Sequence, residues 1–234
     1  MAKEFKGFIK VIFILSLTIN FLLIAFFVGK RIFYANRGYF YRHGYLHPHI
    51  KPNRRWLTFL ASKPDTPEII FAGTSLTQQF QLQVAFNSTH IKNLGFAGNK
   101  TIHLLHQVQK YISRKPMKLF LEAGINDMRY GLSVDSAYGN FVKICTVVKK
   151  ASPQTKLYVQ ATLPTNVPAL NNNIQLYDNK VAAFCLHQQI TYINLYPAFT
   201  RNGLIDSALT TDGIHLNETG YLLWKQQIEK YVTE

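Results

Sequence analysis

The sequence predicts an α/β fold, a three-layer sandwich in which a five-stranded parallel sheet lies between two layers of helices. Two features of residues 57–234 predict it. Short apolar runs of strand length alternate with longer amphipathic stretches, which is typical of a parallel sheet covered by helices on both faces. A glycine or a proline follows each apolar run closely, and this marks where the strand ends.

The apolar runs are the candidate strands. The first, from Glu68 to Ala72, stops at Gly73 and is continuously apolar after its first residue, as expected of a strand buried on both faces. A weaker second run covers residues 91–94. Three more follow at residues 118–123, 157–161 and 190–195. These five runs make up the predicted sheet.

Amphipathic stretches fill the intervals between the predicted strands. Apolar residues recur every three or four positions within residues 102–112, 141–148 and 174–185, and a last stretch runs from about Glu218 to Tyr231. This arrangement predicts a flavodoxin-like sandwich. In such sheets the working residues lie in loops at the carboxyl ends of the strands, so the turns after the first three strands are candidate site segments.

The charge distribution argues against a nucleic-acid partner. The chain has 26 Lys and Arg against 12 Asp and Glu, a formal charge of +14. Residues 1–55 hold ten basic residues and one acidic residue, a net +9 around one hydrophobic segment, whereas residues 56–234 carry only +5. Because no basic arm or aromatic-basic repeat accompanies this charge, we expect an anionic membrane surface rather than nucleic acid as the partner.

Residues 11–29 form an uninterrupted stretch of nineteen uncharged residues. At about 1.5 Å per residue, a helix of this length reaches about 28 Å, close to the hydrocarbon thickness of a bilayer. Phe27 and Val28 lead directly into Gly29 and Lys30, which is a poor cleavage site, so an uncleaved signal anchor is favoured over a cleaved signal peptide. The predicted organisation is a basic N-terminus (1–10), a transmembrane anchor (11–29), a basic aromatic linker (30–56) and a folded domain (57–234).

The linker and the flanks of the span leave two questions. Positive charges on the two sides of the span are nearly balanced, so the positive-inside rule does not settle membrane orientation. His43, His47 and His49 lack neighbouring carboxylates, and Pro48 separates two of them, so we expect no metal site there. The sequence does not indicate an oligomeric state.

The chain has two cysteines, Cys145 and Cys185. Two are too few for a disulfide-rich scaffold or a four-cysteine zinc site. Both lie in apolar, helix-like segments, which favours buried free thiols. A single disulfide is the alternative if the domain faces an oxidising compartment.

The turn after the first strand, Gly73-Thr74-Ser75, is the first candidate for chemistry. A serine just beyond a buried strand, where a helix begins, presents its hydroxyl at the edge of the sheet. Its own N–H then points toward any group attached to that hydroxyl. A helix N-cap is the alternative for Ser75, because serine and threonine are favoured there.

The turns after the second and third strands carry candidate donors to a developing negative charge. Gly98 lies in the segment Asn93-x-Gly-x-x-Gly, where a backbone N–H can serve as an oxyanion donor. Asn126, in Gly124-x-Asn-Asp, offers a neutral carboxamide donor, and Asp127 can cap the next segment or brace the loop. Ordinary turns, including an Asx turn, are the alternatives for these segments.

Near the C-terminus, Asp212 and His215 are separated by two residues. Side chains at this spacing on one turn can hydrogen-bond directly. The carboxylate would fix the imidazole tautomer and leave the other ring nitrogen free to act as a base. Metal ligation is the alternative, but the sequence offers no third or fourth ligand near the pair.

Together the four segments occur in the order Ser, Gly, Asn and Asp-x-x-His. This combination resembles the SGNH hydrolase superfamily, also called the GDSL esterase/lipase family, over about residues 66–232. The resemblance implies that Ser75 is the nucleophile of a triad with His215 and Asp212. It also implies an oxyanion hole formed by the Ser75 and Gly98 N–H groups and the Asn126 side chain. No metal or organic cofactor is implied.

The sequence departs from the family pattern at Thr74, where the named motif has Asp. Threonine keeps a hydroxyl but loses a carboxylate. The triad is untouched, because Asp212 supplies the orienting carboxylate. The departure therefore bears on loop bracing and substrate preference, and Thr74 and Asp127 are expected to be supporting residues.

The resemblance covers both ester hydrolysis and acyl transfer. We expect a serine esterase, and the predicted membrane anchor would suit acyl esters of cell-envelope glycans or lipids. Short acyl groups such as acetyl are favoured, because residues 57–234 contain no long apolar lid segment. One alternative is an O-acyltransferase that uses the same site on envelope polysaccharide. Another is a non-catalytic, membrane-tethered binding or assembly protein. The resemblance also favours a single-pass protein with its domain outside the cytoplasm, in the periplasm or at the cell surface, where envelope esters occur.

Overall fold

The computed structural model describes residues 16, 18–21, 23–31, 54–64 and 67–234. The chain divides into two units, Met1–Pro48 and His49–Glu234. In the first unit the described residues are helical, and apolar side chains such as Phe21 and Phe26 are exposed. No helix within the described ranges is both long and apolar enough to cross a membrane. The predicted basic N-terminus, much of the predicted span and residues 32–53 of the predicted linker, with its three histidines, lie outside these ranges.

The second unit contains the predicted five-stranded parallel sheet. Its strands are β1 (Ile69–Ala72), β2 (Ile91–Asn93), β3 (Lys118–Leu121), β4 (Lys156–Gln160) and β5 (Thr191–Ile193). They lie in the order β2-β1-β3-β4-β5, and every neighbouring pair is parallel. This is the flavodoxin-like strand order. The predicted fold class and all five predicted strands are therefore confirmed, with ends that differ by one or two residues.

Long helices connect the strands. Those predicted from periodicity are α6 (Thr101–Tyr111), α8 (Val134–Ala151), α9 (Pro168–His187) and α11 (Glu218–Thr233). Helix α3 (Arg54–Ala61) begins inside the predicted linker. Four further helices are too short for a periodic pattern to reveal: α4 (Ser75–Gln79), α5 (Leu82–Ala85), α7 (Ile125–Arg129) and α10 (Tyr196–Phe199). Smaller elements are the 3₁₀ turns η1 (Ile112–Arg114) and η2 (Ser207–Leu209) and the strand pair β6 (Thr200–Arg201) and β7 (Leu204–Ile205).

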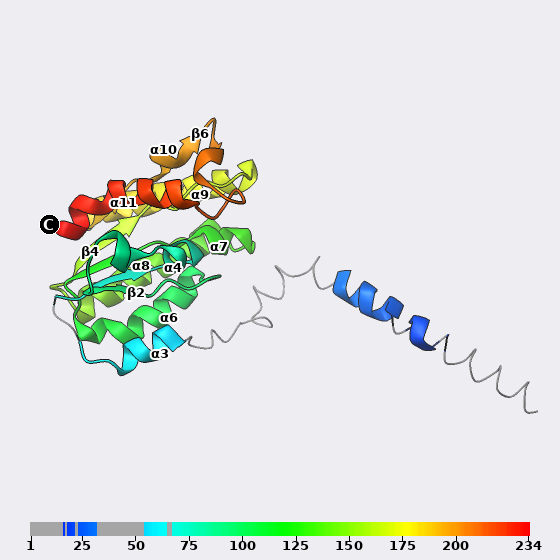
Figure 1. Ribbon diagram of the computed structural model, residues 1–234, viewed down its shortest axis with the longest axis horizontal. Coiled ribbons are helices and arrows are strands. Elements are labelled where there is room, and N and C mark those ends of the chain that lie inside the picture. Colours follow the sequence, from blue (N-terminus) through cyan, green and yellow to red (C-terminus); the bar gives the residue numbers. More distant parts are fainter. Residues whose placement is uncertain (1–15, 17, 22, 32–53, 65–66) are drawn as a thin grey trace, which may run out of the picture. The chain divides into compact units, whose positions relative to one another are not determined.

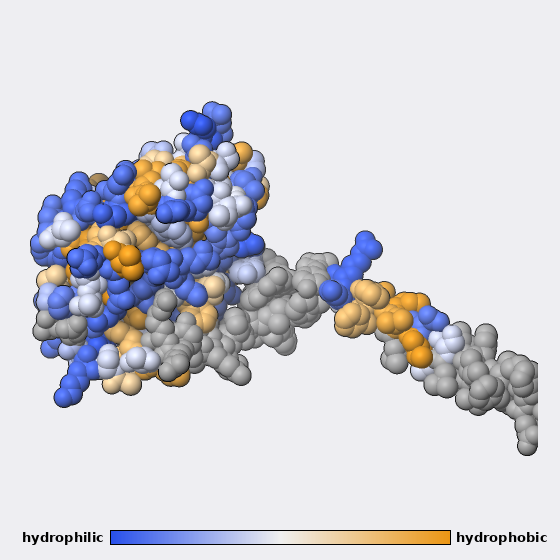
Figure 2. All heavy atoms as spheres, in the orientation of Figure 1, coloured by the Kyte–Doolittle hydropathy of each residue, from blue (hydrophilic) through white to orange (hydrophobic). Residues whose placement is uncertain are grey.

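Two apolar cores cover the two faces of the sheet. Ile70 and Ala72 of β1 belong to the core shared with α3, α6, α8 and α9, whereas Ile69 and Phe71 belong to the core shared with α4 and α11. The alternation follows from the two-residue period of a strand. Figure 1 shows α3 and α6 on one side of the sheet and α11 on the other. On the face drawn in Figure 2, hydrophilic residues dominate this unit and hydrophobic ones form small, separate patches.

Helix α11 is fixed at both ends, and this anchors the loop that precedes it. The Asn217 side chain caps the helix by accepting from the Gly220 N–H at 2.9 Å. At the other end, the buried Lys118 ammonium donates to the carbonyls of Tyr231 and Val232 at 2.9 and 3.0 Å. These bonds satisfy carbonyls that a helix terminus leaves unpaired. The loop that carries Asp212 and His215 therefore leads into a fixed helix.

The two cysteines are buried and free, as the sequence predicted. Cys145 lies in α8 and Cys185 in α9. Burial raises the pKa of Cys185 to about 12 and that of Cys145 further. Both thiols are therefore protonated near neutral pH and act as small apolar side chains in the core.

Candidate active site

Ser75 is the first residue of α4, directly after β1. The N-cap of this helix is Thr74, whose hydroxyl accepts from the Leu76 N–H at 3.3 Å. The cap role considered for Ser75 is therefore filled by its neighbour. This leaves the Ser75 hydroxyl at the carboxyl edge of the sheet, where Oγ lies 3.1 Å from Nε2 of His215.

Asp212 and His215 form the second part of the site. His215 Nδ1 lies 2.7 Å from Oδ2 of Asp212, and the other carboxylate oxygen accepts from the backbone N–H groups of His215 and Ile214 at 2.7 and 3.0 Å. The bonds from the His215 ring and backbone lower the pKa of Asp212 to about 2. The carboxylate is therefore ionised across the physiological range, although about half of its surface is exposed (52%).

The turns that carry Gly98 and Asn126 are joined to the Ser75 turn through Asn99. The Asn99 side chain donates to the Gly73 carbonyl at 3.0 Å, and the Asn126 side chain donates to the Asn99 carbonyl at 2.9 Å. Gly98 has a φ of +78°, a conformation that favours glycine. The turns after β1, β2 and β3 are thus linked by direct hydrogen bonds.

Asp127, in the short helix α7, is completely buried. Its carboxylate accepts from the backbone N–H and the hydroxyl of Thr101 at 2.9 and 2.6 Å, and so binds the start of α6. Burial raises the pKa of Asp127 to about 6, against the opposing effect of the Thr101 bonds. The residue braces one turn against another, which is one of the two roles that the sequence allowed for it.

A residue that the sequence analysis did not single out, Glu122, lies beneath the Ser75 turn. It follows β3, is fully buried, and accepts hydrogen bonds from Thr74 and Thr77. The sequence could have indicated this residue, since Glu122 follows the apolar residues Leu119, Phe120 and Leu121, and a carboxylate at the end of a buried strand is unusual. Thr74, the departure from the family motif, is itself completely buried and donates to this carboxyl group.

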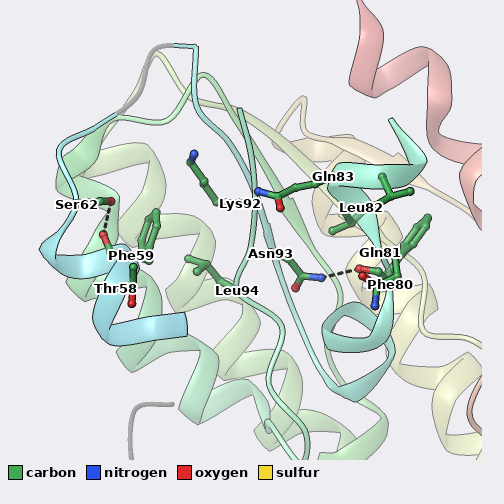
Figure 3. A pocket seen from close by; sticks show the side chains of 11 residues that line it. Thr58, Phe59, Ser62, Phe80, Gln81, Leu82, Gln83, Lys92, Asn93 and Leu94 are labelled. Atoms are coloured by element: carbon green, nitrogen blue, oxygen red, sulfur yellow. Dashed lines mark hydrogen bonds between the residues drawn. The ribbon is translucent and has the colours of Figure 1, made fainter. Parts of the chain in front are cut away.

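A groove of about 580 Å³ lies away from these residues, along the edge strand β2. In Figure 3, Lys92, Asn93 and Leu94 lie between Phe59 of α3 and the segment around Leu82. The Asn93 side chain donates to the Phe80 carbonyl at 2.9 Å and closes one wall. None of the predicted site residues lines this groove.

The described residues contain no group of three or more His, Cys, Asp or Glu side chains placed to hold a metal ion. What the geometry does provide is a hydroxyl, an imidazole and a carboxylate in one hydrogen-bonded series. That series is the arrangement by which serine hydrolases activate a nucleophile.

Comparison with known proteins identifies the family. The model of the GDSL-like lipase/acylhydrolase family matches residues 70–223, which is more than half of the chain. The chain belongs to this family.

Similar proteins include a curated relative and several solved structures. An N-acylneuraminate cytidylyltransferase of Streptococcus agalactiae serotype V is 23% identical over 131 residues, which cover 56% of this chain and 32% of the relative. The chain thus spans about a third of the length of the curated relatives it matches.

A GDSL-like lipase of Bacteroides thetaiotaomicron superposes with a TM-score of 0.68 at 19% identity, covering 76% of this chain and 96% of that one. A carbohydrate esterase family 3 protein of Talaromyces cellulolyticus superposes with a TM-score of 0.59 at 15% identity, covering 70% and 95%. At these identities the likeness shows the fold.

Proposed function

We propose that the protein is a serine esterase that removes short acyl groups, such as acetyl, from glycans or lipids of the cell envelope. Ser75 is the nucleophile, His215 the general base, and Asp212 the residue that orients His215. The observation that carries this proposal is the unbroken series from Ser75 Oγ to His215 Nε2 (3.1 Å) and from His215 Nδ1 to Asp212 (2.7 Å).

The reaction proceeds by two acyl transfers. As Ser75 Oγ attacks the ester carbonyl carbon, its proton passes to Nε2 of His215, and the resulting imidazolium is stabilised by the Asp212 carboxylate. The tetrahedral intermediate collapses, and the alcohol leaves with the proton from His215. Water then attacks the acyl-serine with His215 again acting as base. This second attack releases the carboxylic acid and restores Ser75.

Three donors receive the oxyanion in this proposal: the backbone N–H groups of Ser75 and Gly98 and the Asn126 carboxamide. One N–H of the Asn126 side chain already binds the Asn99 carbonyl, which fixes the amide plane. The other N–H is then held in a set direction. Preorganised donors of this kind lower the barrier because they need no reorientation as the charge develops.

Glycan esters are the better of the two substrate classes. The Talaromyces protein is named a carbohydrate esterase, and the curated relatives are named for N-acylneuraminate, a sugar. We therefore propose that an acyl ester of a sugar is the first substrate to test with this protein. The bound acyl group is proposed to be short, since the described segments around Ser75 and His215 are a five-residue helix and a short loop rather than a long apolar lid.

The test uses the purified full-length chain with p-nitrophenyl acetate, butyrate and octanoate, and with a fluorophosphonate that labels activated serines. We expect hydrolysis of the acetate ester to be fastest and Ser75→Ala to abolish both turnover and labelling. Equal rates for the wild type and Ser75→Ala would reject the nucleophile. Supplying a glycan acceptor separates the transferase alternative, in which acylated glycan would accumulate instead of free acid.

We further propose that residues 11–29 anchor the protein in a membrane and that the catalytic domain lies outside the cytoplasm. Support comes from the nineteen uncharged residues between Lys10 and Lys30 and from the exposed apolar side chains of the described helical residues there. Protease added to spheroplasts or an equivalent intact-cell preparation should digest the domain before the membrane is broken. Survival of the domain until lysis would place it in the cytoplasm and point to intracellular esters.

A further inference from the structure

Glu122 makes an unusual set of contacts under the nucleophile turn. One carboxyl oxygen, Oε2, accepts three hydrogen bonds: from the Thr74 N–H at 3.0 Å, from the Thr74 hydroxyl at 2.8 Å and from the Thr77 hydroxyl at 3.1 Å. Thr74 precedes Ser75 and Thr77 follows it by two residues. The three donors therefore bracket the serine on both sides.

The second carboxyl oxygen of Glu122 has no hydrogen-bond partner within the part of the chain that the structure describes. The whole side chain is buried, and burial raises its pKa. Asp178 and Tyr221 are the titratable groups that interact with it electrostatically. Burying a carboxyl group whose hydrogen bonds all fall on one oxygen costs stability, so its position beside Ser75 makes Glu122 a candidate for a role in the site.

The backbone around Glu122 is shaped to admit it. A Cβ atom added to Gly73 would lie 2.8 Å from Oε2 of Glu122 and 2.7 Å from its carbonyl oxygen, and would also overlap the Thr77 hydroxyl. Any side chain at position 73 would displace either the glutamate or the turn. The glycine before Thr74-Ser75 is thus needed for the close approach of the carboxyl group to the turn.

We propose that Glu122 is a positioning residue for the esterase reaction, because its Oε2 ties Thr74 and Thr77 together and so fixes the direction of the Ser75 hydroxyl. This inference rests on the proposed function of Ser75. It also accounts for the departure at position 74. The motif would carry a carboxyl group at position 74. Here Glu122, directly after β3, provides the carboxyl group, and Thr74 provides the donors that bind it.

The role requires an acceptor oxygen at this place rather than a negative charge. Glu122→Gln keeps an oxygen that can accept the same three bonds, whereas Glu122→Leu keeps the volume and removes every acceptor. A serine that is misdirected by about 1 Å loses reactivity by up to about 100-fold. Substrate binding depends on other groups, so KM should change much less than kcat.

The experiment measures fluorophosphonate labelling rates and kcat and KM for p-nitrophenyl acetate on the full-length chain, well below the melting temperature of each variant. Glu122→Leu should lower both the labelling rate and kcat by about 10- to 100-fold. Glu122→Gln should restore them to within about threefold, because the acceptor is retained. Thr77→Val, which removes one donor without changing shape, should lower them by a smaller factor and serves if Glu122→Leu does not fold.

Glu68 provides the matched control. It is also a buried glutamate, but it lies before the amino end of β1, where it pairs with Arg114 at 2.8 Å. Glu68→Gln should lower the melting temperature and leave the labelling rate of the folded protein unchanged. Labelling of Glu122→Leu or Thr77→Val at the wild-type rate would overturn the inference, as would a Glu122→Gln variant as slow as Glu122→Leu. Failure of the wild type itself to label would instead reject the proposed function.

Discussion

The two halves of the candidate site are built in opposite ways. On the nucleophile side, Thr74 is completely buried, and its partner Glu122 lies 48 residues away in the sequence. On the base side, His215 and Asp212 are three residues apart, with 28% and 52% of their side chains exposed. The serine is held by long-range contacts inside the protein, whereas the histidine is held by a short loop at the surface.

The pKa values of the carboxyl groups in the two halves are shifted in opposite directions. Hydrogen bonds lower the pKa of the exposed Asp212 to about 2, so it provides a permanent negative charge beside the imidazole. Burial raises the pKa of Glu122, brings that of Asp127 to about 6 and that of Asp178 to about 8. The buried groups accept hydrogen bonds from threonines, whereas Asp212 bonds the His215 ring and can stabilise its cation.

The comparison predicts that Asp212→Asn damages catalysis far more than the fold. Loss of the carboxylate removes the stabilisation of the imidazolium and permits the wrong tautomer, so kcat should fall by about 1,000- to 10,000-fold. The melting temperature should fall only slightly, because the side chain is half exposed and solvent screens the stabilising contribution of its local bonds. Asp206→Asn is the control, since Asp206 makes a similar local bond to the Ala208 N–H outside the triad. A drop of less than tenfold would show that His215 does not depend on Asp212.

The low pKa of Asp212 also predicts how stability and activity depend on acid pH. Because the pKa of Asp212 falls from its ordinary value of 3.8 to about 2 on folding, its stabilising contribution is present above about pH 4 and is lost only as the pH falls toward 2. Protonation of Asp212 therefore does not account for a decline of kcat/KM at milder acidity, and the pH–rate profile tests His215 as the proposed base. A flat rate profile between about pH 5 and 8 would argue against that role.

On the buried side, Asn126→Ala should affect both activity and stability. Removal of one oxyanion donor typically lowers kcat by about 100- to 1,000-fold. Unlike Asp212, the amide is buried and also binds the Asn99 carbonyl, so the variant should lose about 1–2 kcal/mol of stability as well. Asn140→Ala, in α8, removes a bond to the Thr101 hydroxyl of α6 and should lower stability without the rate effect. Unchanged kcat in Asn126→Ala would remove the residue from the oxyanion hole.

The parts of the fold and site that could be predicted are those that depend on residues close together in the sequence. The five strands could be predicted because each apolar run reports its own burial, and the Asp212–His215 pair because its partners are three residues apart. The contact between Glu122 and Thr74 could not, since nothing local to either residue indicates that β1 and β3 are neighbours. Thr74 was recognised as a departure from the motif, but its donor role depends on that strand pairing.

Short helices were missed for a related reason. Helix α4 has five residues, too few to show a periodic pattern, so the cap role of Thr74 could not be separated from that of Ser75 by sequence alone. Helix α3 was placed partly in a linker, because Arg54 and Arg55 precede its buried Trp56 and Phe59 and resemble the basic segment before them. The basic composition of this segment indicated a linker, whereas the packing of Trp56 and Phe59 in the core is visible only in the folded protein.

Thr74→Asp restores the family motif and should make the stability of the buried, nucleophile half depend on pH. The new carboxyl group would face Glu122, and two buried carboxyl groups can share this space only if one stays protonated. Thr74→Asp should therefore lower stability by about 1–3 kcal/mol, with a greater loss at pH 8 than at pH 5. Thr74→Asp combined with Glu122→Gln should relieve most of that loss. Thermal unfolding of both variants at the two pH values checks this, and a Thr74→Asp variant with no pH-dependent loss would contradict it.

The smallest effect is expected at Asp178 of α9, whose carboxyl group accepts from the Thr162 N–H at 3.0 Å. Glu122, Tyr177 and Tyr192 are titratable groups that interact with it. Its pKa is raised from 3.8 to about 8, so the folded state binds a proton that the unfolded state releases, and stability falls as the pH rises from about 4 to 8. Asp178→Asn keeps an acceptor for Thr162 and has no charge to bury. At pH 9 it should raise the melting temperature by about 2–4 °C relative to the wild type, or about 1 kcal/mol. At pH 4 the two proteins should melt together, and a difference of equal size at both pH values would mean that packing, not ionisation, separates them.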